Sequence, residues 1–303
     1  MPRSSTIATV ETEMLRLREL IKPTGGAERV SDTAEAYAWC KRLALGHYEN
    51  FPVGSILVPA HLRRHFFSVY AFSRLGDDIG DEPWTDDPEE RLAALAGLDQ
   101  MLDHPMSCVG HPVLQALHST IEECKLPLSP FHRLIEAFRR DVCGFRPTTW
   151  EDVIEYCTFS ANPVGELVLL LDGGGPPGQL NASNAICTAL QITNFLQDLC
   201  VDRARGREYL PIPLNKAAHH ARALYQEGIT VIDDIRSRRL RWELRLIIAG
   251  GQTMLERCTS MLDELPMRRP ILRKSDYFRV GLRALRLAVR ASKHVLERSK
   301  HVK

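Results

Sequence analysis

The sequence predicts an all-α protein, and three observations support this. Apolar residues recur at helical spacing along most of the 303 residues, whereas no run alternates polar and apolar residues as a half-buried strand would. Helix-start signals, such as Asp87-Pro88 and the Thr149 segment TWED, precede several of these stretches. The stretch Ala185–Arg203 is apolar on almost every side, which is typical of a helix inside a bundle. We therefore predict a single-domain helical bundle around a central cavity.

The chain is expected to divide into a short lead-in and one large domain. We expect residues 1–30 to form a poorly ordered N-terminal segment that reaches just past the Gly25-Gly26 break, and residues 31–303 to form the helical domain. Pro163 is expected to kink the sixth helix of this domain, because proline removes a backbone donor. The helices are expected at 32–46, 61–81, 87–103, 112–124, 130–142, 149–173, 185–203, 230–264 and 276–299.

Composition favours a cytoplasmic enzyme over a membrane-spanning or secreted protein. No apolar run approaches 18 residues, and the N-terminus lacks the apolar core of a signal peptide. The eight cysteines are scattered without a CxxC pair, as expected for reduced thiols. Net charge is +1, yet residues 271–303 hold ten Lys/Arg against two acids, which indicates an anionic partner at this end.

The last predicted helix combines a basic stripe with an adjoining apolar face. Such a helix can be a terminal helix with its charges in water, or it can dock peripherally on anionic lipid at the inner face of the cell membrane. We leave both interpretations open and do not favour nucleic-acid binding, because no aromatic readers interleave the basic residues. The basic residues are Arg279, Arg283, Arg286, Arg290 and Lys293, and the apolar ones are Phe278, Leu282, Leu285 and Val289.

The helix predicted at 185–203 carries a polar stripe on an otherwise apolar surface. Asn194, Asp198 and Asp202 are spaced i, i+4 and i+8 and therefore share one face, with Gln191 one turn earlier. The stripe can be solvated near the helix end, but its apolar flanks favour a site for a hard divalent cation, above all Mg²⁺.

A second acidic stripe follows the helix predicted at 61–81. Tyr70, Arg74, Asp77 and Asp81 fall on one stripe, and Asp78 adjoins it. For this segment alone, an acidic patch that opens onto solvent is the alternative explanation. Two such helices in one chain favour opposed carboxylate clusters that share a metal site.

Opposed acidic helices in a bundle have two common uses. A di-iron site usually needs Glu-x-x-His pairs, and neither acidic helix offers one. A Mg²⁺ cluster that grips a diphosphate needs only carboxylates, water and phosphate oxygens. Arg74, Arg205 and Arg207 lie close to the acids in sequence and can bind phosphate directly. Metal and arginines together would favour loss of diphosphate, above an apolar cavity suited to a hydrocarbon chain and a carbocation.

Three segments carry a resemblance to a known family. YAFSRLGDDIGDE, SANPVGE and LQITNFLQDLCVDRARGREYLP occur in the order of the signature segments of the squalene/phytoene synthase family, and the similarity covers about residues 40–255. ENFPVGS and SANPVG most resemble the bacterial hydroxysqualene synthase (HpnC-type) branch of hopanoid biosynthesis. The resemblance implies Mg²⁺-dependent ionisation of presqualene diphosphate, opening of its cyclopropane, and capture of the cation by water to give hydroxysqualene.

The resemblance also implies roles for individual residues. Tyr156 matches a tyrosine that faces the reacting carbons, and Ala161 and Gly165 match small residues that shape the cavity. Two departures stand out: Tyr48 and Asn50 replace serines common in the family, and GGQTML lacks a tyrosine found in some members. The implied Mg²⁺ ligands are Asp77, Asp78, Asp81, Asn194, Asp198 and Asp202. The implied substrate-binding residues are His47, Tyr70, Arg74, Ala161, Gly165, Gln191, Arg207 and Tyr209.

Plainer interpretations stand beside these assignments. Without the family, Tyr156 would be an ordinary half-buried tyrosine, His47 a loop residue, and Arg207 a surface turn residue. The main alternative activity is head-to-head condensation of two prenyl diphosphates to presqualene diphosphate, squalene or phytoene. A non-catalytic scaffold is disfavoured, because all six acidic-motif positions hold competent ligands. The oligomeric state cannot be inferred from these features.

Overall fold

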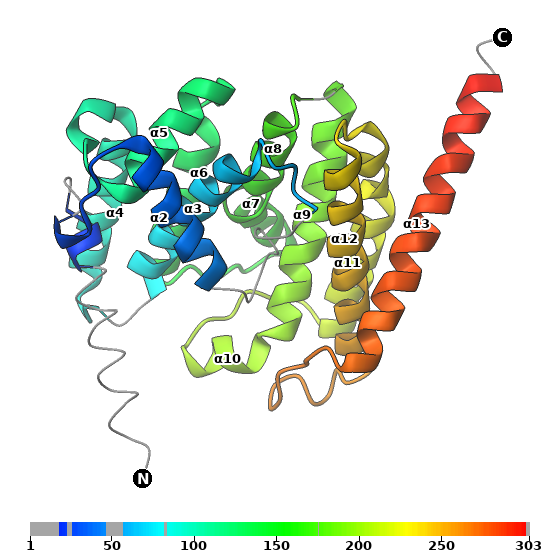
Figure 1. Cartoon of the computed structure of the whole chain (residues 1–303). Helices are drawn as coiled ribbons and strands as arrows, with labels where there is room; N and C mark the ends of the chain where they lie inside the picture. Colours follow the sequence, from blue (N-terminus) through cyan, green and yellow to red (C-terminus); the bar gives the residue numbers. More distant parts are fainter. Residues whose placement is uncertain (1–17, 23–25, 47–56, 82–83, 175, 301–303) are drawn as a thin grey trace. The chain divides into compact units, whose positions relative to one another are not determined.

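The computed structural model describes residues 18–22, 26–46, 57–81, 84–174 and 176–300 (Figure 1). Every regular element in this part of the chain is a helix, so the predicted all-α class is confirmed. None of the described helices is both long enough and apolar enough to span a membrane. Residues 1–17, which make up most of the predicted lead-in, lie outside the described residues.

The helices group into two compact units, residues 1–145 and 146–303. The single domain and its central cavity stay predictions. The first unit contains α2 (Thr33–Gly46), α3 (Arg63–Asp81), α4 (Pro88–Asp103), α5 (Pro112–Cys124) and α6 (Ser129–Val142), with short 3-10 turns η1 (Gly26–Glu28) and η2 (Pro105–Cys108). The second contains α7 (Trp150–Ser160), α8 (Asn162–Leu171), α9 (Pro177–Gln197), α10 (Leu199–Ala204), α11 (Leu214–Gly228), η3 (Ile229–Asp234), α12 (Arg238–Thr259) and α13 (Lys274–Lys300).

Side-chain caps fix the helix starts that the sequence predicted best. Asp87 accepts a hydrogen bond from the Glu89 N–H, ahead of Pro88 in the first turn of α4. Thr149 and Asp152 form a reciprocal capping box at the start of α7. These caps satisfy backbone donors that would otherwise have no partner, so they set the boundary within a residue or two.

Three predicted helices differ from the structure. The helix expected across 149–173 is two helices that meet at Ala161, one residue before Asn162-Pro163, so proline starts a new helix there instead of kinking one. The 185–203 helix begins earlier, at Pro177, and breaks at Asp198. The helix expected at 230–264 spans Arg238–Thr259, because η3 comes before it and turns follow it.

The sequence prediction missed α11 altogether. Its N-cap is Pro213, whose side chain makes no capping hydrogen bond, so the usual start signal is lacking. The buried face consists mainly of alanines that pack against α9. Gly228 ends the helix in close contact with α9: a Cβ there would lie 2.5 Å from the Ala182 carbonyl oxygen. The tight contact explains why small residues cover this face.

The core of the first unit surrounds α3, which contacts α2, α4, α5 and α6. Phe72 is fully buried and meets the Phe131 ring edge to face, with centroids 5.4 Å apart. Ile79 is also fully buried one turn from the end of α3. Burial of this face turns the acidic stripe of α3 away from the core.

The second unit is organised around α9, which contacts α7, α8, α11 and α12. Ile192 and Leu196 are fully buried, and Phe195 is nearly so. A helix surrounded by others needs apolar residues on most sides, as predicted for this stretch. The position of α9 sets where the second acidic stripe lies within this unit.

Candidate active site

The acidic stripe of α3 contains its own cation. Arg74 Nη2 lies 2.5 Å from Asp78 Oδ1, and Arg74 Nη1 lies 4.0 Å from Asp77 Oδ2. Tyr70 and Asp81 are partly exposed on the same helix. Half of the Asp77 side-chain surface is exposed, so its carboxylate is open to a bound ion. The structure thus brings five predicted site residues together on one helix.

Packing behind the stripe fixes the orientation of α3. Gly76 faces Phe138 of α6, and a Cβ at this position would lie 2.4 Å from Phe138 Cε2. A glycine therefore lets α6 approach the helix next to Asp77. The role of Gly76 is structural, and the sequence analysis did not assign it.

The surroundings of Asp77 disfavour its ionised form. Desolvation, reinforced by the negative charge of Asp81, raises the pKa of Asp77 to about 7, although Arg74 opposes the shift. A divalent cation would stabilise the ionised form and reverse this shift.

The second acidic stripe runs across the junction of α9 and α10. The Asp198 N–H donates to the Asn194 carbonyl oxygen, and the Asp202 N–H donates to the Asp198 carbonyl oxygen, each at 2.8 Å. These bonds keep helical i+4 spacing although the helix is broken at Asp198. Asn194 is exposed and the two aspartates are partly exposed. All three predicted ligands thus remain one turn apart.

Sequence reasoning missed a basic residue at this stripe. Arg269, from the segment between α12 and α13, donates through Nε to Asp198 Oδ1. The neighbouring Pro270 carbonyl oxygen accepts a hydrogen bond from Gln197 Nε2 at 3.2 Å. Only the adjacent Arg268-Arg269 pair in a segment without helical pattern signals this contact in the sequence. Arg269 adds a cation to the predicted set.

A glycine turn brings Arg207 back to the acids. Gly206 has a φ of +73°, a conformation that favours glycine, and it follows the end of α10 at Arg205. The Arg207 N–H then donates to the Asp202 carbonyl oxygen at 2.8 Å. This backbone bond places Arg207, a predicted phosphate-binding residue, beside Asp202, a predicted metal ligand.

Three aromatic rings pack together next to the second stripe. The Phe195 and Tyr209 rings stack with centroids 4.5 Å apart and planes 11° apart. The Tyr156 ring lies 5.6 Å from Tyr209 and 6.1 Å from Phe195. Phe195 directly follows Asn194, so the cluster lies within one turn of the acids. The structure thus joins predicted Tyr156 and Tyr209 with Phe195.

The small residues of the SANPVG segment serve helix packing. Ala161 lies between α7 and α8, where its N–H donates to the Cys157 carbonyl oxygen at 3.2 Å. A Cβ on Gly165 would lie 2.4 Å from Ser183 Oγ and 2.5 Å from Cys187 Sγ of α9. Gly165 therefore allows α8 to approach α9, and its role in shaping a substrate cavity stays a prediction. Gln191 is partly exposed on α9.

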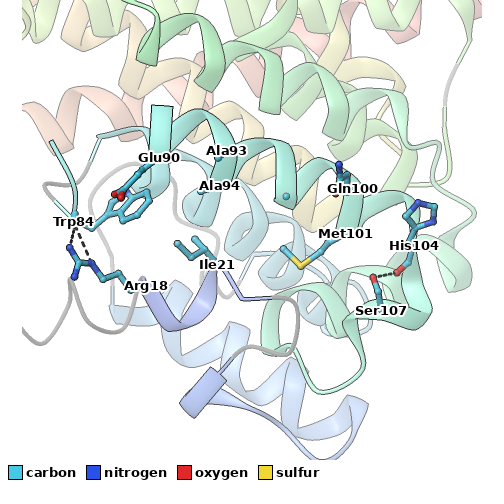
Figure 2. Close-up of a pocket in the computed structure, with 11 residues that line it drawn as sticks. Arg18, Ile21, Trp84, Glu90, Ala93, Ala94, Gln100, Met101, His104 and Ser107 are labelled. Carbon is cyan, nitrogen blue, oxygen red and sulfur yellow. Dashed lines mark hydrogen bonds between the residues drawn. The ribbon is translucent and has the colours of Figure 1, made fainter. Parts of the chain in front are cut away.

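A pocket in the first unit contains none of the predicted site residues (Figure 2). It has a volume of about 750 Å³. Arg18 spans its edge and donates to the Trp84 carbonyl oxygen through Nε at 3.2 Å and Nη2 at 2.7 Å. Its other lining residues include Ile21, Ala93, Ala94, Gly97 and Met101.

The donors of the two stripes fit Mg²⁺ chemically. Carboxylate and amide oxygens are its preferred protein ligands, and waters and phosphate oxygens usually complete the set. Within the described residues, no three His, Cys, Asp or Glu side chains gather as a metal centre made from protein alone. The two stripes belong to different units, so their opposition stays a prediction. Predicted His47 lies outside the described residues.

Comparison with known proteins identifies the family of the chain. Residues 45–219, more than half of the sequence, match the family model for squalene/phytoene synthase. The chain belongs to the squalene/phytoene synthase family. It is accordingly an enzyme of isoprenoid biosynthesis, as the signature segments predicted.

Relatives in this family include bacterial hydroxysqualene synthases. The Sinorhizobium fredii enzyme is 29% identical over 233 residues, which cover 68% of this chain and 78% of that enzyme. The Rhodopseudomonas palustris enzyme is 36% identical over 173 residues, which cover 56% and 57% of the respective chains. The solved squalene synthase HpnC from Alicyclobacillus acidocaldarius is 37% identical with a TM-score of 0.69, over 77% of this chain and 95% of that one.

Proposed function

We propose that this enzyme converts presqualene diphosphate to hydroxysqualene in a Mg²⁺-dependent reaction. The observation that carries the proposal is the aromatic cluster of Tyr156, Phe195 and Tyr209 beside the acidic end of α9. Such a juxtaposition suits a reaction in which a diphosphate leaves and a carbocation remains. The named hydroxysqualene synthases among the relatives support this choice within the family.

The acidic stripes and arginines would hold the leaving group. Asp77, Asp78, Asp81, Asn194, Asp198 and Asp202 would hold Mg²⁺, which supplies positive charge to the diphosphate oxygens when bound. Arg74 and Arg207 lie at the two stripes and can donate to phosphate oxygens. Arg269, which pairs with Asp198 in this structure, would add a third donor for phosphate oxygens. Tyr70 and Gln191 complete the proposed polar set.

The aromatic cluster would act on the other product of ionisation. The carbon–oxygen bond breaks with its electron pair on the diphosphate, and the cyclopropane opens to an allylic cation. Those faces of Tyr156, Phe195 and Tyr209 that are not stacked on a neighbouring ring would attract the positive charge. Attack by one water molecule, followed by loss of a proton to diphosphate or solvent, gives the alcohol.

A labelled product assay tests the proposal. The purified full chain is incubated with Mg²⁺ in ¹⁸O-labelled water, with presqualene diphosphate or with farnesyl diphosphate, and the lipid extract is analysed by mass spectrometry. We expect labelled hydroxysqualene from presqualene diphosphate and no consumption of farnesyl diphosphate. Consumption of farnesyl diphosphate, or an unlabelled hydrocarbon product, would instead place the enzyme in the condensing branch of the family.

A further inference from the structure

The C-terminal helix α13 has a packed face and a polar rim that fix its rotation on α12. Ala284 is buried, and Val280 and Leu287 are partly buried on the same side. Arg257 of α12 donates to Asp276 at 2.6 Å, and Arg283 donates to Glu256 of α12 at 2.6 Å. Figure 1 shows α13 alongside α12. These contacts determine which side of α13 points away from its own unit.

The opposite side of α13 is apolar and exposed. Phe278 is 71% exposed, Leu282 40%, Leu285 53% and Val289 60%. Their spacing of i, i+4, i+7 and i+11 places all four on one stripe of the helix. Four large apolar residues in a row on a surface indicate an interaction site, because single exposed hydrophobic residues are common but contiguous ones are not.

Positive charge borders this apolar stripe. Arg279 and Arg286 each follow a stripe residue directly and lie on the flank of the helix, and both are exposed. Arg286 takes part in no ion pair among the described residues. Asp276, the acid at the start of the helix, pairs with Arg257 of α12. The sequence from 271 to 303 carries ten Lys/Arg and two acids. The partner of this face should therefore combine apolar material with negative charge.

We propose that the exposed face of α13 docks on an anionic lipid surface. An amphipathic helix lying in the plane of the headgroups can insert Phe278 and Leu285 while Arg279 and Arg286 contact lipid phosphates. A second copy of the chain fits less well, because an antiparallel two-fold pair would place the two arginine rows side by side. This inference stands on α13 alone and is independent of the proposed reaction.

Vesicle co-sedimentation of the full chain tests the proposal. The protein is mixed at low salt, in EDTA and without substrate, with vesicles of phosphatidylcholine alone or with 30% phosphatidylglycerol added. We expect binding to the anionic vesicles only. The double variant R279Q/R286Q should bind about 25-fold more weakly, because each basic residue near such a surface contributes about fivefold. The variant F278S/L285S should bind at least about tenfold more weakly.

Matched controls separate this face from general effects. K216Q/R222Q removes two exposed charges from α11, and M106S/V109S removes two exposed apolar residues near η2. Both controls should bind like the unmodified chain, and circular dichroism should be unchanged throughout. Equal binding of the unmodified chain to both vesicle types, or unchanged binding of the α13 variants, would overturn the proposal. So would a chain that does not bind vesicles but forms a dimer in light scattering, if F278S/L285S abolishes that dimer.

Discussion

Replacement of Arg269 by glutamine should alter cation and diphosphate binding in opposite directions. The Arg269–Asp198 ion pair is partly solvated, since the two side chains are 47% and 31% exposed. A pair of this kind contributes about 0.5–1 kcal/mol. A divalent cation that binds Asp198 competes with the Arg269 guanidinium for this carboxylate. Removal of the guanidinium should therefore strengthen Mn²⁺ binding about two- to fivefold. Loss of a charge-assisted donor should weaken diphosphate binding about tenfold or more.

Calorimetric titration of the full chain measures both effects. Mn²⁺ is titrated alone, and diphosphate is titrated in the presence of saturating Mn²⁺. The neighbouring variant R268Q is the matched control. Arg268 Nη1 lies 3.7 Å from Glu264 Oε2, and Arg268 makes no contact with Asp198 among the described interactions. R268Q should leave both affinities within about twofold of the unmodified chain. Unchanged or weaker Mn²⁺ binding by R269Q would refute the argument that this arginine competes with the cation.

Substitutions at Asp198, Asp77 and Gly228 give three further tests. Asp198→Asn should lower turnover by about 10²–10³-fold with an unchanged circular dichroism spectrum, since a metal-ligand charge is lost while the helix persists; a variant with full activity would argue against the metal assignment. Mn²⁺ affinity should fall about tenfold per pH unit below pH 7, because protons then occupy Asp77, whose pKa is raised to about 7. Asp77→Asn should flatten this dependence in Mn²⁺ titrations at several pH values. Gly228→Ala should destabilise the chain by about 1–3 kcal/mol in urea denaturation, because the new Cβ meets backbone atoms of α9. The control Gly250→Ala has open space around its new Cβ and should be neutral or stabilising by up to about 1 kcal/mol. Equal stability of the two variants would contradict the packing argument.

The sequence predicted helices best where local chemistry marks their ends. Pro112–Cys124 was predicted to the residue, and α4 and α7 begin at their capping signals. By contrast, α11 lacks a side-chain cap, and its alanine-rich contact with α9 is visible only in three dimensions. The break at Asp198 was also missed, because apolar residues continue on both sides of it.

The candidate site was predictable one helix at a time. Helical spacing alone placed Asp198 and Asp202 on one face, and the structure keeps that spacing. The contact between Tyr156 and Tyr209 could not be inferred from spacing, because these residues are brought together by packing around Phe195. The same is true of Arg269, which reaches Asp198 from a segment 71 residues away.

Anomalous diffraction from crystals of the full chain with Mn²⁺ and a non-hydrolysable thiodiphosphate analogue tests the central claim most directly. The claim is that the two acidic stripes share the metal ions that hold the leaving diphosphate. We predict manganese peaks bound both by Asp77 or Asp81 of α3 and by Asp198 or Asp202 of the second stripe, with analogue oxygens between them. Manganese confined to one stripe, or bound away from both, would contradict the account.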